Sequence, residues 1–410
     1  MSVLKKITAI ILTALMLFSA VACIPEDGEN EDRSESNSES ASESDTGKNK
    51  DSEKNPEKES EKQSESETEQ ETLVMGEGKS IDIYLIAGQS NAAGCTKITD
   101  RDAAYLWAPE LENGYTNIHY AGNSRNNSSG VRDRDLPWQK TTLGLGIYLG
   151  GSTKYVGPEA GMAKALSVYY NEETGREAGF IKYAFGGSSL LNDTTGSTAK
   201  DGNWVSPSYS RYLGKWNYGA TVTGQMYRNF IDQVEKNLLE LYEYGGYTEI
   251  NIKGLYWMQG CANKSKPAEY KIAFEYFCSD VRADLSKLTL ALTGGKSDLG
   301  AADMPIIVGT ISQTQNLTSA NTEEVNNTFI EMQKKLPETI ENCYVLDNSQ
   351  YPITSWNATT GKAEIVGSDQ WHWNQADALE IGENVGKLIL NDILKVNNTD
   401  TETESEAVVE

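Results

Sequence analysis

Short apolar runs alternate with amphipathic stretches along the middle of the chain. Five runs are rich in β-branched and aliphatic residues and are bounded by glycine or polar residues, as buried strands are: residues 81–87, 178–184, 252–258, 306–311 and 343–346. Between them, apolar side chains recur every three to four residues, which is typical of one helical face. The helices predicted in this way are residues 161–170, 225–244, 267–285, 325–336 and 375–394.

This alternation predicts an α/β fold, a three-layer α/β/α sandwich with a central parallel sheet and long loop insertions, because strands that alternate with helices form βαβ units. Ligands of open parallel sheets bind beyond the carboxyl ends of the strands. Residues 99–157 and 188–223 break the alternation and are rich in Gly, Asn, Ser and aromatic residues. We interpret both as long loops that form the walls of a substrate cleft.

The chain begins with a pattern typical of export. Lys5 and Lys6 precede an apolar run, residues 7–22, that is too short to span a bilayer comfortably. The run ends in Ala20-Val21-Ala22-Cys23, which resembles a bacterial lipobox. Residues 1–23 therefore predict a lipoprotein-type signal peptide with Cys23 as the lipidated residue, and an extracellular protein tethered to the bacterial membrane. The alternative is an ordinary signal peptide with an incidental cysteine.

Most of the net charge of −24 lies outside the predicted folded region, residues 76–398. Residues 26–72 contain 18 acidic and 6 basic side chains, and residues 400–410 contain 5 acidic ones. Such polar segments cannot bury enough apolar surface to fold, so we predict a disordered acidic linker at 24–75 and a disordered tail at 399–410. The absence of a basic patch argues against a nucleic-acid partner.

The four cysteines of the folded region match no zinc motif. They could form disulfides in three ways or remain reduced, and the sequence does not choose: Cys95, Cys261, Cys278 and Cys343.

Candidate chemistry begins at Ser90, which directly follows the apolar run 81–87 and Gly88. A serine on a glycine-permitted turn after a strand is where α/β hydrolases display a nucleophile, although such a serine can also be a helix N-cap. His372 is one of only two histidines and follows Asp369 by three residues, so the aspartate could orient the imidazole. The other histidine, His119, has no carboxylate at a suggestive spacing, and we interpret it as a surface or cleft-lining residue.

These residues resemble a known family. Gly88-Gln89-Ser90-Asn91 after a strand, with D-x-x-H near the C-terminus, is similar to the SGNH (GDSL-like) hydrolase superfamily. Within it, the chain resembles the sialate O-acetylesterase-like and acetylxylan esterases of carbohydrate esterase family six. Three further blocks occur in that branch's order, and together the blocks cover residues 81–390: Gly157-Pro158-Glu159, the run 185–190 and Trp257-Met258-Gln259-Gly260. The resemblance implies an SGNH/flavodoxin-like sandwich and no metal or organic cofactor.

Carried over to this chain, the resemblance implies Ser90 as nucleophile, His372 as general base and then acid, and Asp369 as the orienting carboxylate. The oxyanion hole would consist of the backbone N–H groups of Ser90 and Gly187 and the side-chain amide of Gln259. An amide donates to a developing oxyanion without itself titrating. Which of Gly186 and Gly187 supplies the donor stays open.

One position departs from the family pattern: W-x-Q-G is usually followed by Glu, and here Cys261 stands in its place. A thiol cannot accept the charge-assisted hydrogen bonds of a carboxylate, so the support of the loops around Ser90 must differ. Cys261 as a second nucleophile is a weaker hypothesis, because no second histidine is placed to activate it.

Several tryptophans of the predicted loops could stack on sugars or simply pack. Trp371 and Trp373 are the best candidates for a substrate pocket. The tryptophans are Trp138, Trp204, Trp216, Trp356, Trp371 and Trp373.

Together these observations predict a serine esterase that removes O-acetyl groups from an acetylated carbohydrate, xylan-like or sialate-like. The predicted partners are this carbohydrate, no nucleic acid, and a membrane only through the N-terminal lipid. The alternative is a non-catalytic glycan-binding surface lipoprotein on a decayed hydrolase scaffold, which the cysteine at position 261 motivates. A change of substrate to acetylated peptidoglycan or a lipid ester is a third hypothesis.

Overall fold

The computed structural model describes residues 80–124, 134–146, 154–192, 203–215, 218, 223–243 and 246–396. The predicted signal peptide with Cys23, the linker at 24–75 and the tail at 399–410 lie outside the described residues, as does Trp216. No helix in the described part of the chain is both long and apolar enough to cross a bilayer.

The core of the fold is a seven-stranded sheet with the order β4-β3-β6-β1-β7-β8-β9. All neighbouring strands are parallel except the edge strand β4, which pairs antiparallel with β3. The prediction of an α/β sandwich is confirmed, and each predicted strand is present. The strands are β1 (Ser80–Gly88), β3 (Ile118–Ser124), β4 (Arg134–Lys140), β6 (Glu177–Ala184), β7 (Glu249–Met258), β8 (Ile306–Gly309) and β9 (Cys343–Leu346).

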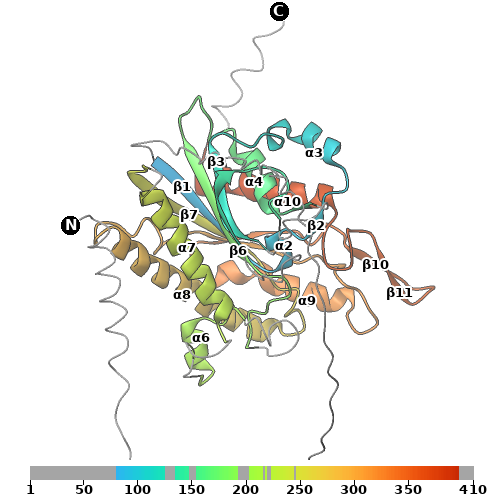
Figure 1. Ribbon diagram of the computed structural model, residues 1–410. Helices are drawn as coiled ribbons and strands as arrows, with labels where there is room; N and C mark the ends of the chain where they lie inside the picture. The colour runs from blue at the N-terminus through green and yellow to red at the C-terminus, as the bar shows by residue number, and fades with distance from the viewer. Residues whose placement is uncertain are drawn as a thin grey trace, which may run out of the picture. The chain divides into compact units, whose positions relative to one another are not determined.

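Helices cover both faces of the sheet, with α4 (Pro158–Leu166) and α10 (Gln375–Leu388) on one face and α7 (Gln225–Glu243) and α8 (Pro267–Leu292) on the other (Figure 1). Helix α9 (Glu323–Lys334) packs on α8, with the rings of Tyr270 and Phe329 4.8 Å apart. Helices α4 and α10 approach so closely that a Cβ on Gly161 would lie 2.1 Å from the Leu379 carbonyl oxygen. All five predicted helices are therefore confirmed.

Shorter elements complete the fold. They are α2 (Ser90–Ala93), β2 (Thr96–Lys97), α3 (Arg101–Trp107), η1 (Pro109–Leu111), β5 (Tyr155–Val156), α6 (Pro207–Tyr212), η3 (Leu336–Glu338), β10 (Thr354–Asn357), β11 (Lys362–Ile365) and the π-helical turn η4 (Ile389–Ile393).

The interpretation of residues 99–157 as a loop is wrong where β3 and β4 extend the sheet. Ile118, Tyr120 and Ala121 of β3 are fully buried, but the polar side chains of His119 and Asn123 are buried among them. These polar residues interrupt the apolar pattern that marks a strand. Within 188–223, the chain likewise forms α6 and buries Trp204 completely.

His119 is not a surface or cleft residue. It lies at the start of β3, and its Nε2 is 3.4 Å from Oε2 of Glu177 at the start of β6. The hydroxyl of Tyr247 donates to the same carboxylate. Ser90 follows the carboxyl end of β1, whereas His119 lies near the amino ends of the parallel strands. His119 and the candidate nucleophile are therefore at opposite ends of the strands. The four cysteines named above are all buried free thiols, so none of them forms a disulfide.

Candidate active site

Three loops leave the sheet at the same level. In the strand register, Gly88 at the end of β1 is aligned with Ala184 of β6 and with Met258 of β7. The ladder continues one step beyond: Phe185 N–H donates to the Gly88 carbonyl at 3.0 Å, and Gln89 N–H donates to the Met258 carbonyl at 3.0 Å. The segments after β1, β6 and β7 therefore begin side by side, as expected for parallel strands.

Gly88 makes the sharp turn between β1 and α2 possible. Its φ is +136°, and a Cβ there would lie 2.2 Å from the Met258 carbonyl oxygen, so only glycine fits. Ser90 is then the first residue of α2 and is 9 % exposed. Within the described part of the chain, neither its N–H nor its hydroxyl makes a hydrogen bond. Both groups thus remain free for a ligand at the carboxyl edge of the sheet.

The glycine turn after β6 lies directly against Ser90. A Cβ on Gly186 would contact the Ser90 Cβ at 3.6 Å, and the next residue, Gly187, has a left-handed φ of +73°. The turn is closed by Ser188, whose hydroxyl donates to the Phe185 carbonyl at 2.6 Å and accepts from the Trp204 indole at 2.8 Å. A rigid backbone with N–H groups next to a serine can act as an oxyanion hole.

Gln259 holds this turn from the side of β7. Its fully buried amide nitrogen donates to the Ser188 carbonyl at 3.2 Å and to Oδ1 of Asn263 at 2.8 Å. The Leu190 N–H donates to the same Asn263 oxygen, which sets the orientation of both amides. Each hydrogen of the Gln259 amide thus has an acceptor. Its role as a direct oxyanion donor stays a prediction, while its contacts give it a positioning role at the Ser188 turn.

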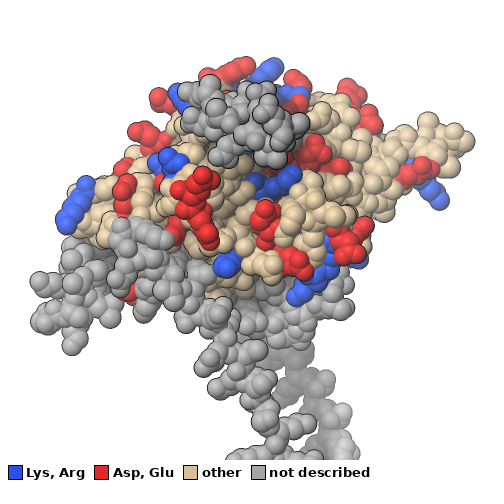
Figure 2. Space-filling model, turned by 90° about the horizontal axis from the view of Figure 1, so that it is seen from above, with Lys and Arg blue, Asp and Glu red and all other residues tan. Residues whose placement is uncertain are grey.

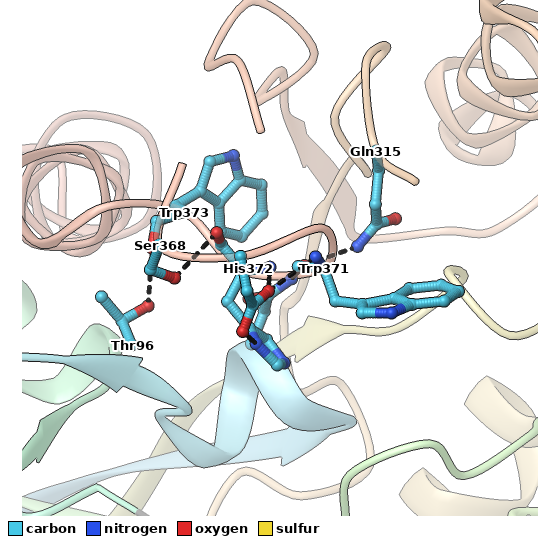
Figure 3. A network of polar contacts seen from close by, with 8 residues as sticks. Thr96, Gln315, Ser368, Trp371, His372 and Trp373 are labelled. Atoms are coloured by element: carbon cyan, nitrogen blue, oxygen red, sulfur yellow. Dashed lines mark hydrogen bonds and ion pairs between the residues drawn. The ribbon is translucent and has the colours of Figure 1, made fainter. Parts of the chain in front are cut away.

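His372 and Asp369 form a close pair. Oδ2 of Asp369 lies 2.6 Å from Nδ1 of His372, and Oδ1 accepts the backbone N–H groups of Trp371 and His372 at 2.7 and 2.8 Å. Figure 3 shows the side chain of His372 pointing toward the ribbon of α2, the helix that begins with Ser90. A carboxylate on Nδ1 leaves Nε2 as the ring nitrogen available for proton transfer.

The electrostatics of the pair favour an ionised aspartate. Burial alone would raise the pKa of Asp369, but its hydrogen bonds with His372, the imidazolium charge and the two backbone N–H groups hold this pKa below its ordinary value. The carboxylate consequently keeps its charge through the neutral range, where it can stabilise a protonated imidazole.

The segment that begins with Ser90 holds the loop that carries His372. The Asn91 amide donates to the Trp371 carbonyl at 3.3 Å, and the Thr96 hydroxyl donates to the Trp373 carbonyl at 3.2 Å. Gln315, which follows β8, also donates to the Trp371 carbonyl, at 2.8 Å (Figure 3). Both peptide carbonyls that flank the histidine are therefore anchored, although Ser90 and His372 make no direct hydrogen bond. Catalytic contacts of this kind often tighten only with substrate bound.

The position of Cys261 shows how the loops are supported without the usual glutamate. Its side chain is buried, and burial raises the pKa of the thiol to about 11, so it is neutral and not a nucleophile at neutral pH. The loop after β7 is instead fixed by Oε1 of Gln89, which accepts the N–H groups of Gly260 and Ala262 at 3.2 and 3.4 Å. A neutral amide from the loop of Ser90 itself thus supports this loop.

Lys264 is a residue that the sequence did not single out. Its ammonium donates to the Gln315 carbonyl at 3.1 Å and lies 5.4 Å from the ring centroid of Trp371. Burial lowers the pKa of Lys264 to about 8. In the sequence, Lys264 could have been noticed from its position three residues after Cys261, in the loop that follows β7. Lys264 helps to fix the tryptophan that precedes His372.

The tryptophans divide into two groups. Trp138, Trp204 and Trp373 are buried and donate their indole N–H groups within the protein, so they pack the interior. The interpretation of Trp373 as a pocket residue is therefore wrong. Trp371 and Trp356 are 41 % and 38 % exposed.

The sandwich and the polar groups at the carboxyl ends of β1, β6 and β7 define the chain as an SGNH-type α/β hydrolase. Residues 80–296 match the family model described as "Carbohydrate esterase, sialic acid-specific acetylesterase", and the chain belongs to this family. Membership supports carbohydrate acetylesterase activity and confirms the resemblance identified from the sequence. A search of curated proteins finds no match to the chain.

Solved structures with a similar fold include three proteins of low sequence identity. The structure of NanS is 14 % identical, with 77 % of this chain and 98 % of that chain covered and a TM-score of 0.46. A carbohydrate acetylesterase from Xanthomonas citri is 13 % identical, with coverages of 76 % and 56 % and a TM-score of 0.43. A protein from Arabidopsis thaliana is 17 % identical, with coverages of 76 % and 98 % and a TM-score of 0.41.

Proposed function

We propose that this protein is a carbohydrate O-acetylesterase in which Ser90, His372 and Asp369 act as a catalytic triad. The observation that carries the proposal is the anchoring of the His372 loop. Asn91, adjacent to the serine, bonds to the carbonyl adjacent to the histidine, while Asp369 holds the imidazole through Nδ1. Such an arrangement matches the nucleophile, base and orienting acid that acyl transfer requires.

In the first half of the proposed reaction, Oγ of Ser90 attacks the acetyl carbonyl carbon and its proton passes to Nε2 of His372. The resulting oxyanion is stabilised by the backbone N–H groups of Ser90 and Gly187. To donate as well, the Gln259 amide would exchange its bond to the Ser188 carbonyl for one to the substrate. The bond from the acetyl carbon to the sugar oxygen then breaks, and the sugar leaves with the proton from His372.

In the second half, His372 takes a proton from water as the water oxygen attacks the acetyl-serine. The ester bond to Ser90 breaks, Oγ recovers its proton from the imidazolium, and acetate leaves. Asp369 stays ionised and stabilises the imidazolium in both halves.

The test measures acetate released by the wild-type protein from acetylated xylan, O-acetylated sialic acid and O-acetylated peptidoglycan. We expect release from at least one of them, together with covalent labelling of Ser90 by a fluorophosphonate, located by peptide mass spectrometry. Binding to a glycan without acetate release or labelling would instead support the non-catalytic alternative and contradict the proposal.

Replacing Asp369 with Asn is expected to lower kcat by about 10²- to 10³-fold, less than for a fully enclosed aspartate because its side chain is 46 % exposed and water can partly replace it. Asparagine cannot ionise, so raising the pH from 6 to 9 should not restore the loss. Initial rates across this pH range are the measurement. Asp377→Asn, which changes an N-terminal residue of α10, is the control and should retain the wild-type kcat. A kcat of Asp369→Asn that recovers at high pH would contradict this role.

We further propose that the enzyme acts outside the cell, anchored through a lipid on Cys23, on carbohydrates near the cell surface. This rests on the sequence of residues 1–23. Radiolabelled palmitate should be incorporated by the wild-type chain in a bacterial host and not by Cys23→Ala.

A further inference from the structure

Strands β10 and β11 form a two-stranded antiparallel hairpin that is separate from the main sheet. In Figure 1 this hairpin projects from the body of the domain, beyond the N-terminal end of α10. A two-stranded hairpin in water is at best marginally stable alone, so one that projects in this way invites a functional explanation.

The hairpin has one apolar and one polar face. Residues directly opposite each other in an antiparallel pair share a face, as do residues two apart in one strand. The pairs Trp356–Ala363 and Thr354–Ile365 therefore share one face. The pairs Ser355–Glu364 and Asn357–Lys362 share the other, where the Asn357 amide donates to Glu364 at 2.6 Å.

The apolar face is covered at its base, where Thr354 is fully buried, but its outer part is exposed. On this outer part, Trp356 is 38 % exposed and Ile365 is 54 % exposed. In Figure 2 the corresponding projection, found by its place in Figure 1, is largely uncharged. Contiguous exposed apolar side chains on a soluble domain usually mark a binding surface.

The hairpin is connected to the candidate active site through the chain segment that carries His372. The N–H groups of Val366 and Gly367 donate to the Ile353 carbonyl at 2.8 and 2.7 Å, which closes the base of the hairpin. Directly after it, the Ser368 hydroxyl donates to the His372 carbonyl at 2.9 Å. The exposed ring of Trp371 belongs to the same loop. Hairpin and histidine thus share one hydrogen-bonded segment.

We propose that the apolar face of the β10–β11 hairpin, centred on Trp356, is a carbohydrate subsite that binds the sugar chain of a polymeric substrate away from the acetyl group under attack. The proposal rests on the proposed function and adds a substrate class, an extended polysaccharide. The C–H face of a pyranose ring is flat and apolar and packs on an indole, while its hydroxyl groups remain in water. The aliphatic side chain of Ile365, on the same face, extends this contact.

The size of the surface favours a sugar chain over a second copy of the protein. Partly exposed Trp356, Ile365 and Trp371 together present on the order of 300 Å², less than half of the roughly 800 Å² per partner of a stable protein interface. One or two sugar rings need less area than this.

The experiment compares acetylated xylan, a polymer, with 4-nitrophenyl acetate, a small ester that has no sugar chain to bind the hairpin. For Trp356→Ala we expect the KM for the polymer to rise about five- to tenfold, the effect of losing one aromatic stacking contact, with kcat/KM for the small ester unchanged. Trp356→Phe keeps a ring and should recover most of the affinity. Leu106→Ala, which removes an 85 % exposed leucine from α3, is the matched control and should change neither value.

An unchanged polymer KM in Trp356→Ala would overturn the proposal. An equal loss on both substrates would also overturn it, because the hairpin would then act only by positioning His372. A concentration-dependent dimer in light scattering that Trp356→Ala abolishes would assign the surface to a second copy instead. If the wild type released no acetate at all, the proposed function would fail, and retardation of wild type but not Trp356→Ala in xylan affinity gels would still support the subsite.

Discussion

Replacing Ser90 with alanine is expected to lower kcat for acetate release by about 10⁵- to 10⁶-fold, because loss of the nucleophile removes the covalent route altogether. The residual rate would come from the oxyanion donors and from substrate binding. Since the hydroxyl of Ser90 bonds to no other described residue, its removal should leave stability nearly unchanged. The KM for the acetylated sugar should also change little, because one hydroxyl contributes little to ground-state binding.

The measurement combines acetate release under saturating substrate with urea unfolding of the same preparation. Ser355→Ala is the matched control, since this serine is exposed on the polar face of the hairpin and should retain full activity and stability. Activity of Ser90→Ala within tenfold of the wild type, in a folded protein, would rule out the serine mechanism.

Three of the correctly predicted strands share one property. Strands β1, β6 and β7 lie inside a parallel sheet with helices on both faces, so nearly every side chain is apolar and the run is easy to recognise. Strand β3 is also central, but it carries His119 and Asn123, whose partners come from Glu177 and from the Ala184 backbone. Because those partners are supplied by tertiary structure, a local apolar pattern could not reveal the strand.

The candidate site likewise combines residues that the sequence could indicate with contacts that it could not. Ser90, His372 and Asp369 were recognisable because each residue type is scarce or distinctive in its local context. The contacts that bring their loops together end on backbone carbonyls, as in the bonds from Asn91 to Trp371 and from Thr96 to Trp373. Any residue type supplies a carbonyl, so a sequence cannot indicate which one will be used.

Lys182 is a residue whose structural role the sequence could have indicated. It is a lysine in the middle of an apolar run, and a fully buried lysine requires a partner. The structure supplies three: Oε2 of Glu159 at 3.1 Å and the carbonyls of Ala93 and Leu145 at 3.1 and 3.2 Å. Ala93 is the last residue of α2, so this buried ion pair holds the C-terminal end of the helix that begins with Ser90.

Replacing Lys182 with methionine is therefore expected to reduce the free energy of unfolding by about 3–5 kcal/mol, because it leaves the carboxylate of Glu159 buried without its cation. Glu159→Leu should reduce the free energy of unfolding by a similar amount, because it leaves the ammonium of Lys182 buried without its anion. The double variant removes both charges and should recover most of the loss, since apolar residues of similar volume often replace a buried pair without cost. Urea unfolding of all four proteins measures these differences.

The control is the pair Lys164–Glu383, which has the same chemistry at 2.8 Å but is partly exposed, with side-chain exposures of 29 % and 15 %. Lys164→Met should cost only about 1 kcal/mol or less, because water solvates the remaining carboxylate. Equal costs at Lys182 and Lys164 would contradict the assigned burial. A double variant as unstable as either single variant would show that the ammonium bonds to Ala93 and Leu145, rather than the charge pairing, hold the helix of the nucleophile.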